Sequence, residues 1–395
     1  MMLRLVRCVT RLMCAAFFAW GGAAVAAPVV PASDDEVIET LPARLAGQPV
    51  TVREALARDQ RDPIEAATLA RRYLAEARDR GDPRYAGYAS AAIAPWKSDP
   101  NAPSPIAVLD ATIAQYQHDF ERARRILQGV RAREPANAQA VLTLATVDRV
   151  QGRYADSDRS CRAVPERLYA AACLAENMAL RGETDNARKI VQALLASRIA
   201  SGERSADIER WLITTLAELE ERAGHADAAD SAFRSGLALG RDSYLILDYA
   251  DFLLAHQRVN EAANLLAKEP TPYGDGVLLR LAIAHRALKA PDAALLVADL
   301  KARFDAARER GDAISVHGRE LARFELVLRG DAKTALVVAR DNLRIQKEPA
   351  DFLVMAEAAR AGKDAAALAE TAALAKSIGL VDARLDALVT FNAGN

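Results

Sequence analysis

Apolar residues recur at helical spacing along most of the chain, and between residues 118 and 164 the pattern occurs twice. The first copy places a large residue, a small residue and two further apolar residues on one helical face, at Phe120, Ala123, Leu127 and Val130. The second copy repeats that order 34 residues later, at Tyr154, Ser157, Cys161 and Val164. A period of this size predicts helix pairs that stack on one another.

The small residue of this pattern can be followed through eight copies. It lies early in the second helix of each expected pair, at Ala123, Ser157, Ala187, Ala229, Ala262, Ala294, Ala335 and Ala367. A side chain of this size lets two helix backbones approach, and a bulky apolar residue one turn later fills the space beside it. Five copies have a glycine five residues earlier, which indicates the turn between the helices, at Gly152, Gly182, Gly224, Gly330 and Gly362.

Composition agrees with an all-α fold. The chain is 51% hydrophobic but only 5% aromatic, whereas a β-sandwich of this length would need more aromatic and β-branched residues. We therefore predict an all-α solenoid, which grows by adding helix pairs and need not divide into compact domains. Two longer intervals between copies locate insertions at 197–207 and 305–314, each of which either lengthens a second helix or adds a loop.

The repeated pattern resembles the tetratricopeptide repeat, whose helix pairs carry W-x2-L-G-x2-Y, then A-x3-F, then proline. The resemblance covers residues 104–378 and implies a right-handed α-solenoid of about eight repeats. Residues 51–95 look like a degenerate helix pair that caps the N-terminal end of the array. Residues 379–395 are expected to form a C-terminal capping helix and a tail.

The first 26 residues have the design of a signal peptide. Three arginines precede an apolar run that ends in Ala24-Val25-Ala26, a small-residue cleavage site. The apolar run is short for a membrane-spanning helix, so we expect cleavage and a periplasmic or secreted protein without an integral membrane segment. Residues 27–50 are rich in proline and alanine and form a flexible lead-in.

The charge of the exported chain gives no reason to expect a nucleic-acid partner. The full sequence has 52 basic and 53 acidic residues, and the leader removes three arginines and no acid, so the mature net charge is −4. Binding to nucleic acid would need a basic surface, which this balance does not supply.

Two cysteines remain after export, Cys161 and Cys173. An oxidising compartment permits a disulfide between them, because they lie on helices expected to be neighbours. The alternative is two buried free thiols that pack as small hydrophobic residues, and the sequence slightly favours this alternative. No histidine or further cysteine lies at the spacing of a zinc site, so no metal is expected.

The sequence contains no recognisable catalytic set and no motif for a cofactor. H-E-x-x-H, G-x-S-x-G and phosphate-binding glycine loops are absent. Five histidines are spread over different repeats, and the carboxylates alternate with arginines as they do on solvated helix faces. We therefore expect a protein that is not an enzyme and has no cofactor.

The resemblance also implies a binding surface, because in this family the first helices line a concave face that binds extended peptides. The matching positions here carry three aromatic residues, four acids and an arginine at either end, namely Tyr169, Trp211, Tyr244, Glu176, Glu218, Glu221, Asp251, Arg149 and Arg286. The alternative is that the aromatic side chains pack between repeats and the acids face solvent.

Two functions follow from this organisation. The first is an exported scaffold or adaptor that holds another envelope protein, or an extended peptide segment of one, on its concave face. The second is a binding protein for a small cationic or sugar-like ligand that uses the same groove of aromatic and acidic residues.

Overall fold

The computed structural model describes residues 62–80, 82–97, 99–202, 205–311 and 313–390. The chain divides into residues 1–60 and 61–395, and the described residues all lie in the second unit. They form helices, and no strand occurs among them, so the prediction of an all-α fold is confirmed. The predicted signal peptide (1–26), the lead-in (27–50), residues 51–61 and the last five residues lie outside the described part.

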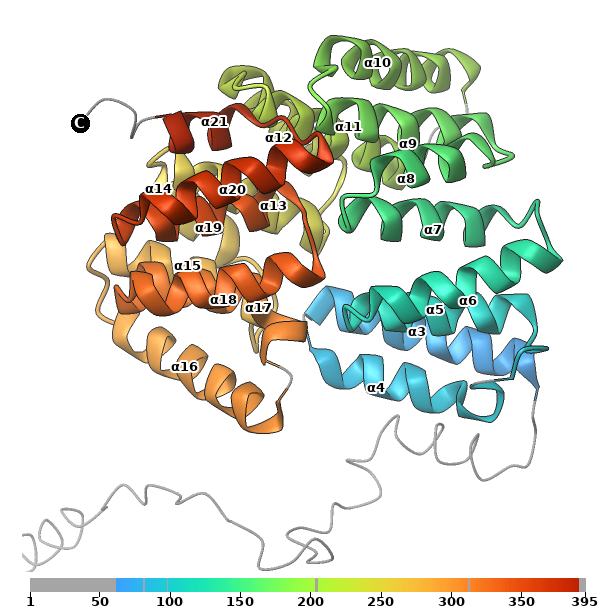
Figure 1. The fold of residues 1–395 in the computed structure, drawn as a ribbon, viewed down its shortest axis with the longest axis horizontal. Helices are drawn as coiled ribbons and strands as arrows, with labels where there is room; N and C mark the ends of the chain where they lie inside the picture. The colour runs from blue at the N-terminus through green and yellow to red at the C-terminus, as the bar shows by residue number, and fades with distance from the viewer. Residues whose placement is uncertain (1–61, 81, 98, 203–204, 312, 391–395) are drawn as a thin grey trace, which may run out of the picture. The chain divides into compact units, whose positions relative to one another are not determined.

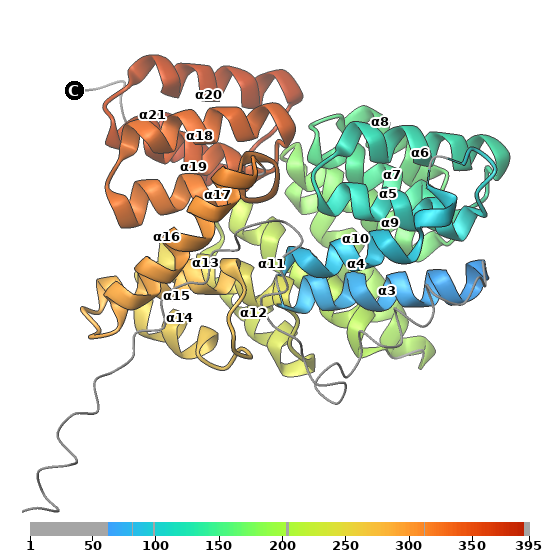
Figure 2. The same cartoon turned by 90° about the horizontal axis from the view of Figure 1, so that it is seen from below.

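The helices follow one another as stacked hairpins (Figures 1 and 2). An N-terminal pair consists of α3 (Pro63–Arg80) and α4 (Pro83–Ala92), followed by the short η1 (Ala94–Trp96). The next pairs are α5 (Ser104–Tyr116) with α6 (Phe120–Arg133), α7 (Ala138–Val150) with α8 (Tyr154–Arg162), α9 (Arg167–Leu180) with α10 (Thr184–Ser201), and α11 (Ala206–Arg222) with α12 (Ala226–Leu239).

The second half of the array continues in the same way. Its pairs are α13 (Ser243–Ala255) with α14 (Val259–Leu266), α15 (Asp275–Ala287) with α16 (Ala293–Arg310), α17 (Ala313–Arg323) and its π-helical continuation η2 (Phe324–Arg329) with α18 (Ala332–Ile345), and α19 (Pro349–Ala361) with α20 (Ala365–Ile378). The last helix is α21 (Ala383–Thr390). From α5 to α20 the described chain thus forms a tetratricopeptide-like array of helix hairpins, as the repeat pattern predicted.

From α5–α6 to α19–α20, the turn inside each pair contains one residue in the left-handed region. These residues are His118, Gly152, Gly182, Gly224, Gln257, Lys289, Gly330 and Lys363. All five predicted turn glycines lie in these turns. In the last of them Gly362 has a helical φ of −79°, and the left-handed residue is Lys363. The second helix of this pair is capped by Asp364, whose carboxylate accepts a hydrogen bond from the backbone N–H of Ala367.

The small residues lie where the helix backbones meet. Ala123, Ser157, Ala187, Ala229, Ala262, Ala335 and Ala367 are all buried. The hydroxyl of Ser157 donates to the carbonyl oxygen of Ala145 at 2.8 Å, so this polar group is buried without loss of hydrogen bonding. Ala294 is the exception and is exposed, because its helix α16 begins only at Ala293 after a longer turn.

Both insertions lengthen a second helix. In the region of the first insertion, α10 runs for 18 residues to Ser201, and in the second, α16 runs for 18 residues to Arg310. The sequence left a longer helix and an added loop open, and the structure has the longer helices.

The C-terminal pairs return to the middle of the array. The backbone N–H of Lys347 donates to the carbonyl oxygen of Val150 at 2.7 Å, and that of Val381 donates to Leu180 at 2.9 Å. Connectors of the C-terminal pairs therefore touch the ends of α7 and α9, which lie far from them in sequence. This contact encloses the inner side of the array and positions the cavity described next.

Candidate functional site in the concave cavity

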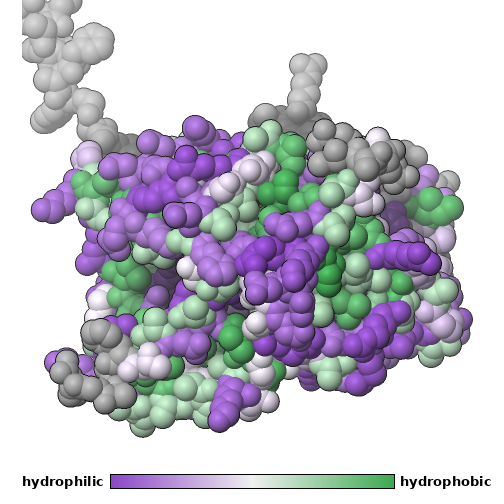
Figure 3. All heavy atoms as spheres, turned by 90° about the horizontal axis from the view of Figure 1, so that it is seen from above, coloured by the Kyte–Doolittle hydropathy of each residue, from purple (hydrophilic) through white to green (hydrophobic). Residues whose placement is uncertain are grey.

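A cavity of about 1120 Å³ lies on the inner side of the array. Its wall is formed mainly by the first helices of the pairs, α7, α9, α11, α13, α15, α17 and α19, together with α21. The second helices lie outside, so the alternation of first and second helices separates an inner wall from an outer surface. Figure 3 shows one outer face, on which hydrophilic side chains predominate.

Eight of the nine residues predicted to form the concave groove line this cavity. They are Arg149, Tyr169, Glu176, Trp211, Glu218, Glu221, Tyr244 and Asp251. Arg286 does not line it. The exposed Arg286 side chain instead donates to the carbonyl oxygens of Val327, at 3.2 Å, and Leu328, which end the π-helical segment η2. Terminal helix carbonyls lack partners within their own helix, and Arg286 supplies one.

The three aromatic residues have different surroundings. The ring centroids of Tyr169 and Trp211 are 5.9 Å apart, and the half-buried Trp211 also packs on the hydrophobic core between α9 and α11. Tyr244 is 61% exposed, and it is the one exposed large hydrophobic side chain of the described residues that lines the cavity. Trp211 thus combines packing with cavity lining, whereas Tyr244 presents its ring to the cavity.

All four predicted acids are paired with arginines of the same chain, and Glu218 has the longest contact, 3.7 Å to Arg222. Glu176 contacts Arg149, and the Glu221 carboxylate lies 2.8 Å from a terminal nitrogen of Arg384. Asp251 binds both Arg280 and Arg323. Nine cationic side chains also line the cavity, namely Arg78, Arg149, Arg222, Arg280, Arg319, Arg323, Lys347, Arg360 and Arg384. The expectation of a mainly acidic groove is therefore wrong.

The pairing determines the protonation of these acids. Burial alone would raise the pKa of Asp251, but the guanidinium groups of Arg280 and Arg323 outweigh it and hold the pKa below its ordinary value. For Glu176 and Glu221, burial outweighs the neighbouring arginine and raises the pKa. Asp251 is therefore a fixed negative charge, while Glu176 and Glu221 ionise less readily.

Asp248 is a site residue that the sequence analysis missed. It lines the cavity one helical turn after Tyr244, and burial followed by the charge of Glu218 raises the pKa of Asp248 well above its ordinary value. Glu218 accepts a hydrogen bond from the Tyr244 hydroxyl, and its closest arginine nitrogen, on Arg222, is 3.7 Å away. Asp248 lies four residues after Tyr244 and therefore on the same face of the helix, so this spacing could have identified it from the sequence.

Several basic residues of the cavity were also missed, and the sequence held no local signal for most of them. Arg319 and Arg323 come from α17, and Arg384 comes from α21. They reach the cavity only because the array curves back on itself. Arg319 binds Glu348 and Asp351 at the start of α19, so it ties two walls of the cavity together.

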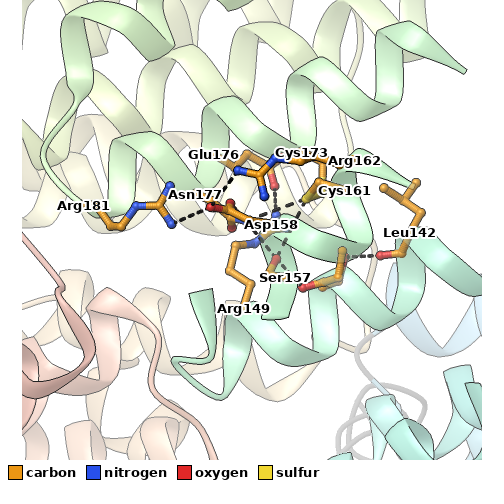
Figure 4. The surroundings of a disulfide bond; sticks show 12 residues. Leu142, Arg149, Ser157, Asp158, Cys161, Arg162, Cys173, Glu176, Asn177 and Arg181 are labelled. Carbon is orange, nitrogen blue, oxygen red and sulfur yellow. Dashed lines mark hydrogen bonds and ion pairs between the residues drawn. A yellow bond between two sulfur atoms is a disulfide. The ribbon is translucent and has the colours of Figure 1, made fainter. Parts of the chain in front are cut away.

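Cys161 and Cys173 form a disulfide between α8 and α9 (Figure 4). The slightly favoured alternative of two free thiols is thus corrected: α8 and α9 bring the two Cα atoms to 5.6 Å, within the ordinary range for a disulfide. Close to the bridge, the side-chain nitrogen of Asn177 donates hydrogen bonds to Ser157 and Asp158, each 2.9 Å long. Cys173 itself lines the cavity.

The described residues offer no group of three or more His, Cys, Asp or Glu side chains that could hold a metal ion. Within the same part of the chain, no helix is both long and apolar enough to cross a bilayer.

No protein-family model matches the sequence, and no curated protein matches it. Solved structures are similar at low identity. A tetratricopeptide repeat protein from Parabacteroides merdae is 16% identical, and the similarity covers 60% of this chain and 93% of that chain with a TM-score of 0.39. The type IV pilus biogenesis factor PilW is 18% identical over 62% of this chain and 95% of its own, with a TM-score of 0.36.

A Rap protein in complex with competence and sporulation factor is similar over a longer stretch. It is 12% identical, and the similarity covers 88% of this chain and 94% of that chain with a TM-score of 0.46. At these TM-scores the superpositions are loose, and the description of the fold rests on the helix pairs themselves.

Proposed function

We propose that this protein is an exported scaffold that binds another envelope protein, or an extended segment of one, in its concave cavity. The observation that carries the proposal is the exposed ring of Tyr244 inside a cavity walled by eight helices. Large aromatic side chains that face a concave surface concentrate binding energy, because they bury much area and lose little side-chain entropy.

The charges of the cavity limit which segment fits. Glu176, Glu221 and Asp251 are already paired within the chain, so a partner's lysine or arginine would gain little from them. Glu218 is held more loosely, 3.7 Å from Arg222, and burial with the charge of Glu218 raises the pKa of Asp248, so these two acids are the ones left to receive such a cation. The partner segment therefore combines an apolar or aromatic side chain for Tyr244 with at most one or two cations.

Export is part of the same proposal. The basic leader, the apolar run and the small-residue cleavage site support secretion to the periplasm or beyond. The disulfide between Cys161 and Cys173 supports it as well, because disulfides persist in oxidising compartments.

A second candidate function is binding of a small cationic or sugar-like ligand. The observation in its favour is the size of the cavity, about 1120 Å³, close to the range of about 300 to 1000 Å³ that is typical of small-ligand sites. Tyr244 and Trp211 would then stack on the ligand, and Glu218 and Asp248 would accept its donors.

Two experiments separate the candidates. Affinity capture from an envelope fraction should recover a protein with the wild type and lose it with Tyr244→Ala, while a variant outside the cavity, Tyr88→Ala, retains it. A thermal-shift screen with cationic metabolites and sugars tests the alternative. If a ligand stabilises the protein and the capture fails, the protein is a small-ligand receptor and the scaffold proposal is wrong.

A further inference from the structure

A second cavity, of about 520 Å³, is lined by η1, the loop that follows η1, and the helices α5 and α6. Among the described residues, none lines both this cavity and the concave cavity. Its volume falls within the range of about 300 to 1000 Å³ that is typical of small-ligand sites. We call it the outer cavity, and it has room for a small organic molecule apart from any guest of the concave cavity.

Part of the outer cavity is apolar and rigid. Ile93, Ile106 and Ala107 line it and are buried in the hydrophobic clusters of the N-terminal pair and the first repeat. The half-buried indole of Trp96 packs on both of these clusters and also lines the cavity. An aromatic ring that is held by two clusters offers contact area to a ligand at little further cost in side-chain entropy.

Gly129 leaves the backbone of α6 open to the outer cavity. Arg122, Ile126, Gly129 and Arg133 recur at helical spacing and line the cavity from one face of α6. Glycine inside a helix costs about 0.5 to 1 kcal/mol relative to alanine. A Cβ atom on Gly129 would have nothing within 4 Å, so the packing of the fold does not require this glycine. Its missing side chain contributes space to the cavity instead.

Positive charge predominates in the outer cavity. Four cationic side chains and two carboxylates line it, namely Lys97, Arg122, Arg125, Arg133, Asp99 and Asp110. A terminal nitrogen of Arg122 lies 2.5 Å from a carboxylate oxygen of Asp110. Within the described part of the chain, the other three cations have no carboxylate within 4 Å, so the charge of the cavity is only partly neutralised.

The three cations without a carboxylate differ in their neighbours. Arg133 donates to the carbonyl oxygens of Pro100 and Ala102, the second at 3.3 Å, so it holds the loop after η1 against α6. Lys97 donates to the hydroxyl of Ser90. The Arg125 side chain has neither an ion pair nor a hydrogen bond to any described residue, and it lines the cavity with its guanidinium group available. A guanidinium group pairs with a carboxylate or phosphate through two parallel hydrogen bonds.

We propose that the outer cavity binds a small organic anion that carries a flat ring. The carboxylate or phosphate group of the ligand pairs with Arg125, and its ring contacts the indole of Trp96. The inference does not rest on the scaffold function, because the two cavities share no described lining residue.

Fluorine NMR of the full chain labelled with fluorotryptophan tests the site directly. The chain has three tryptophans, Trp20, Trp96 and Trp211, whose resonances can be assigned with the single Trp→Phe variants. Indoleacetate, the probe, should shift the resonance of Trp96 and leave that of Trp211 unchanged. The neutral indoleacetamide, which lacks the charge, and acetate, which lacks the ring, should each bind at least about tenfold more weakly.

Variants on α6 separate the charge from the space. Arg125→Gln should weaken indoleacetate binding at least about tenfold, because it removes the guanidinium group. Arg131→Gln is the matched control, since Arg131 belongs to the same helix but does not line the cavity, and it should bind like the wild type. Gly129→Leu should fill the cavity and abolish binding at unchanged helicity, whereas Gly129→Ala adds only a methyl group and should retain binding.

Three results would overturn the proposal. In the first, indoleacetate, benzoate and phenyl phosphate at millimolar concentration all leave the resonance of Trp96 unmoved. In the second, indoleacetamide binds as tightly as indoleacetate, or Arg125→Gln weakens binding no more than Arg131→Gln does. In the third, the probe shifts Trp211 alone, which would assign it to the concave cavity and favour the small-ligand receptor over the outer site. Capture of an envelope protein is a separate readout, and the scaffold function stands or fails with that readout alone.

Discussion

Tyr244 donates a hydrogen bond from its hydroxyl group to the carboxylate of Glu218. The bond joins the neighbouring first helices α13 and α11 and holds a ring that is 61% exposed against the wall of the cavity. An aromatic side chain fixed in this way loses little freedom when a guest covers it, so its contact area converts efficiently into binding energy.

Tyr244→Ala should weaken binding of the captured partner by about 2 kcal/mol, the magnitude of an interface hot spot. The free energy of unfolding should change by less than about 1 kcal/mol, because the ring packs on little of the core. Calorimetric titration and denaturant unfolding measure the two quantities. Tyr88→Ala is the matched control, since Tyr88 is 49% exposed but lies against Tyr73 and Tyr85 in the N-terminal pair.

Trp211→Ala should behave differently from Tyr244→Ala. The indole packs on the core between α9 and α11, so its loss should cost about 1 to 3 kcal/mol of stability as well as binding. The sequence left groove lining and packing between repeats open as alternatives for Trp211, and the structure combines the two. Equal stabilities of Trp211→Ala and the wild type would contradict this assignment.

Opposite pH effects are expected at Asp248 and Asp251. Burial raises the pKa of Asp248, so this group lowers stability as the pH rises above about 4, the ordinary aspartate value. Asp248→Asn should therefore stabilise the protein by about 1 kcal/mol at pH 8 and have little effect at pH 3.

Asp251 should show the reverse. Although burial opposes it, the pairing with Arg280 and Arg323 lowers the pKa of Asp251, so its contribution is present above about pH 4 and is lost as the pH falls through the folded value. Asp251→Asn should cost about 1 to 2 kcal/mol at pH 7, because it leaves the buried Arg280 without its carboxylate. Denaturant unfolding between pH 3 and 8 measures both variants, and parallel profiles would refute the assignment.

The contact between Val381, in the connector from α20 to α21, and the turn after α9 predicts a difference between two turn glycines. Gly182→Ala and Gly330→Ala both place a side chain on a left-handed residue, which should cost about 1 kcal/mol in each case. Gly182→Ala should cost about 1 to 3 kcal/mol more, because its methyl group would meet Val381 at 3.1 Å. Thermal unfolding of the two variants compares them directly, and equal losses would show that Val381 does not contact the turn after α9 in solution.

The disulfide should contribute measurably to stability. Cys161 and Cys173 are 12 residues apart, and a bridge across a loop of that size is worth about 3 kcal/mol in the chain-entropy model. The double variant Cys161→Ala/Cys173→Ala should lose about 2 to 3 kcal/mol in denaturant unfolding. Thiol labelling of the unreduced, denatured wild type checks the bridge itself, and two reactive thiols would rule it out.

The helix pairs could be predicted because their cause is local. A small residue, such as the buried Ala123 or Ala229, is needed wherever two helix backbones meet, and the same requirement recurs in each repeat. Gly362 lies in its turn as predicted, but Lys363 takes the left-handed conformation one residue later, which the glycine pattern cannot reveal.

The composition of the cavity could be predicted only in part. Positions within one first helix, such as Tyr169 and Glu176, follow from the repeat register. The partners of the acids do not, because Arg323 reaches Asp251 across 72 residues of chain and only after the array has curved. A register counted repeat by repeat therefore identified the acids and Arg149, and it missed Arg280, Arg323 and Arg384, which pair with Asp251 and Glu221.

The most direct test of the central claim places a photo-crosslinking amino acid, benzoylphenylalanine, at position 244 in the intact cell, with the same substitution at position 88 as control. Residue 244 faces the cavity and residue 88 does not line it. The account predicts a discrete cross-linked protein from position 244, identified by mass spectrometry, and no such product from position 88. A product from position 88 alone, or none from position 244, would contradict binding in the concave cavity.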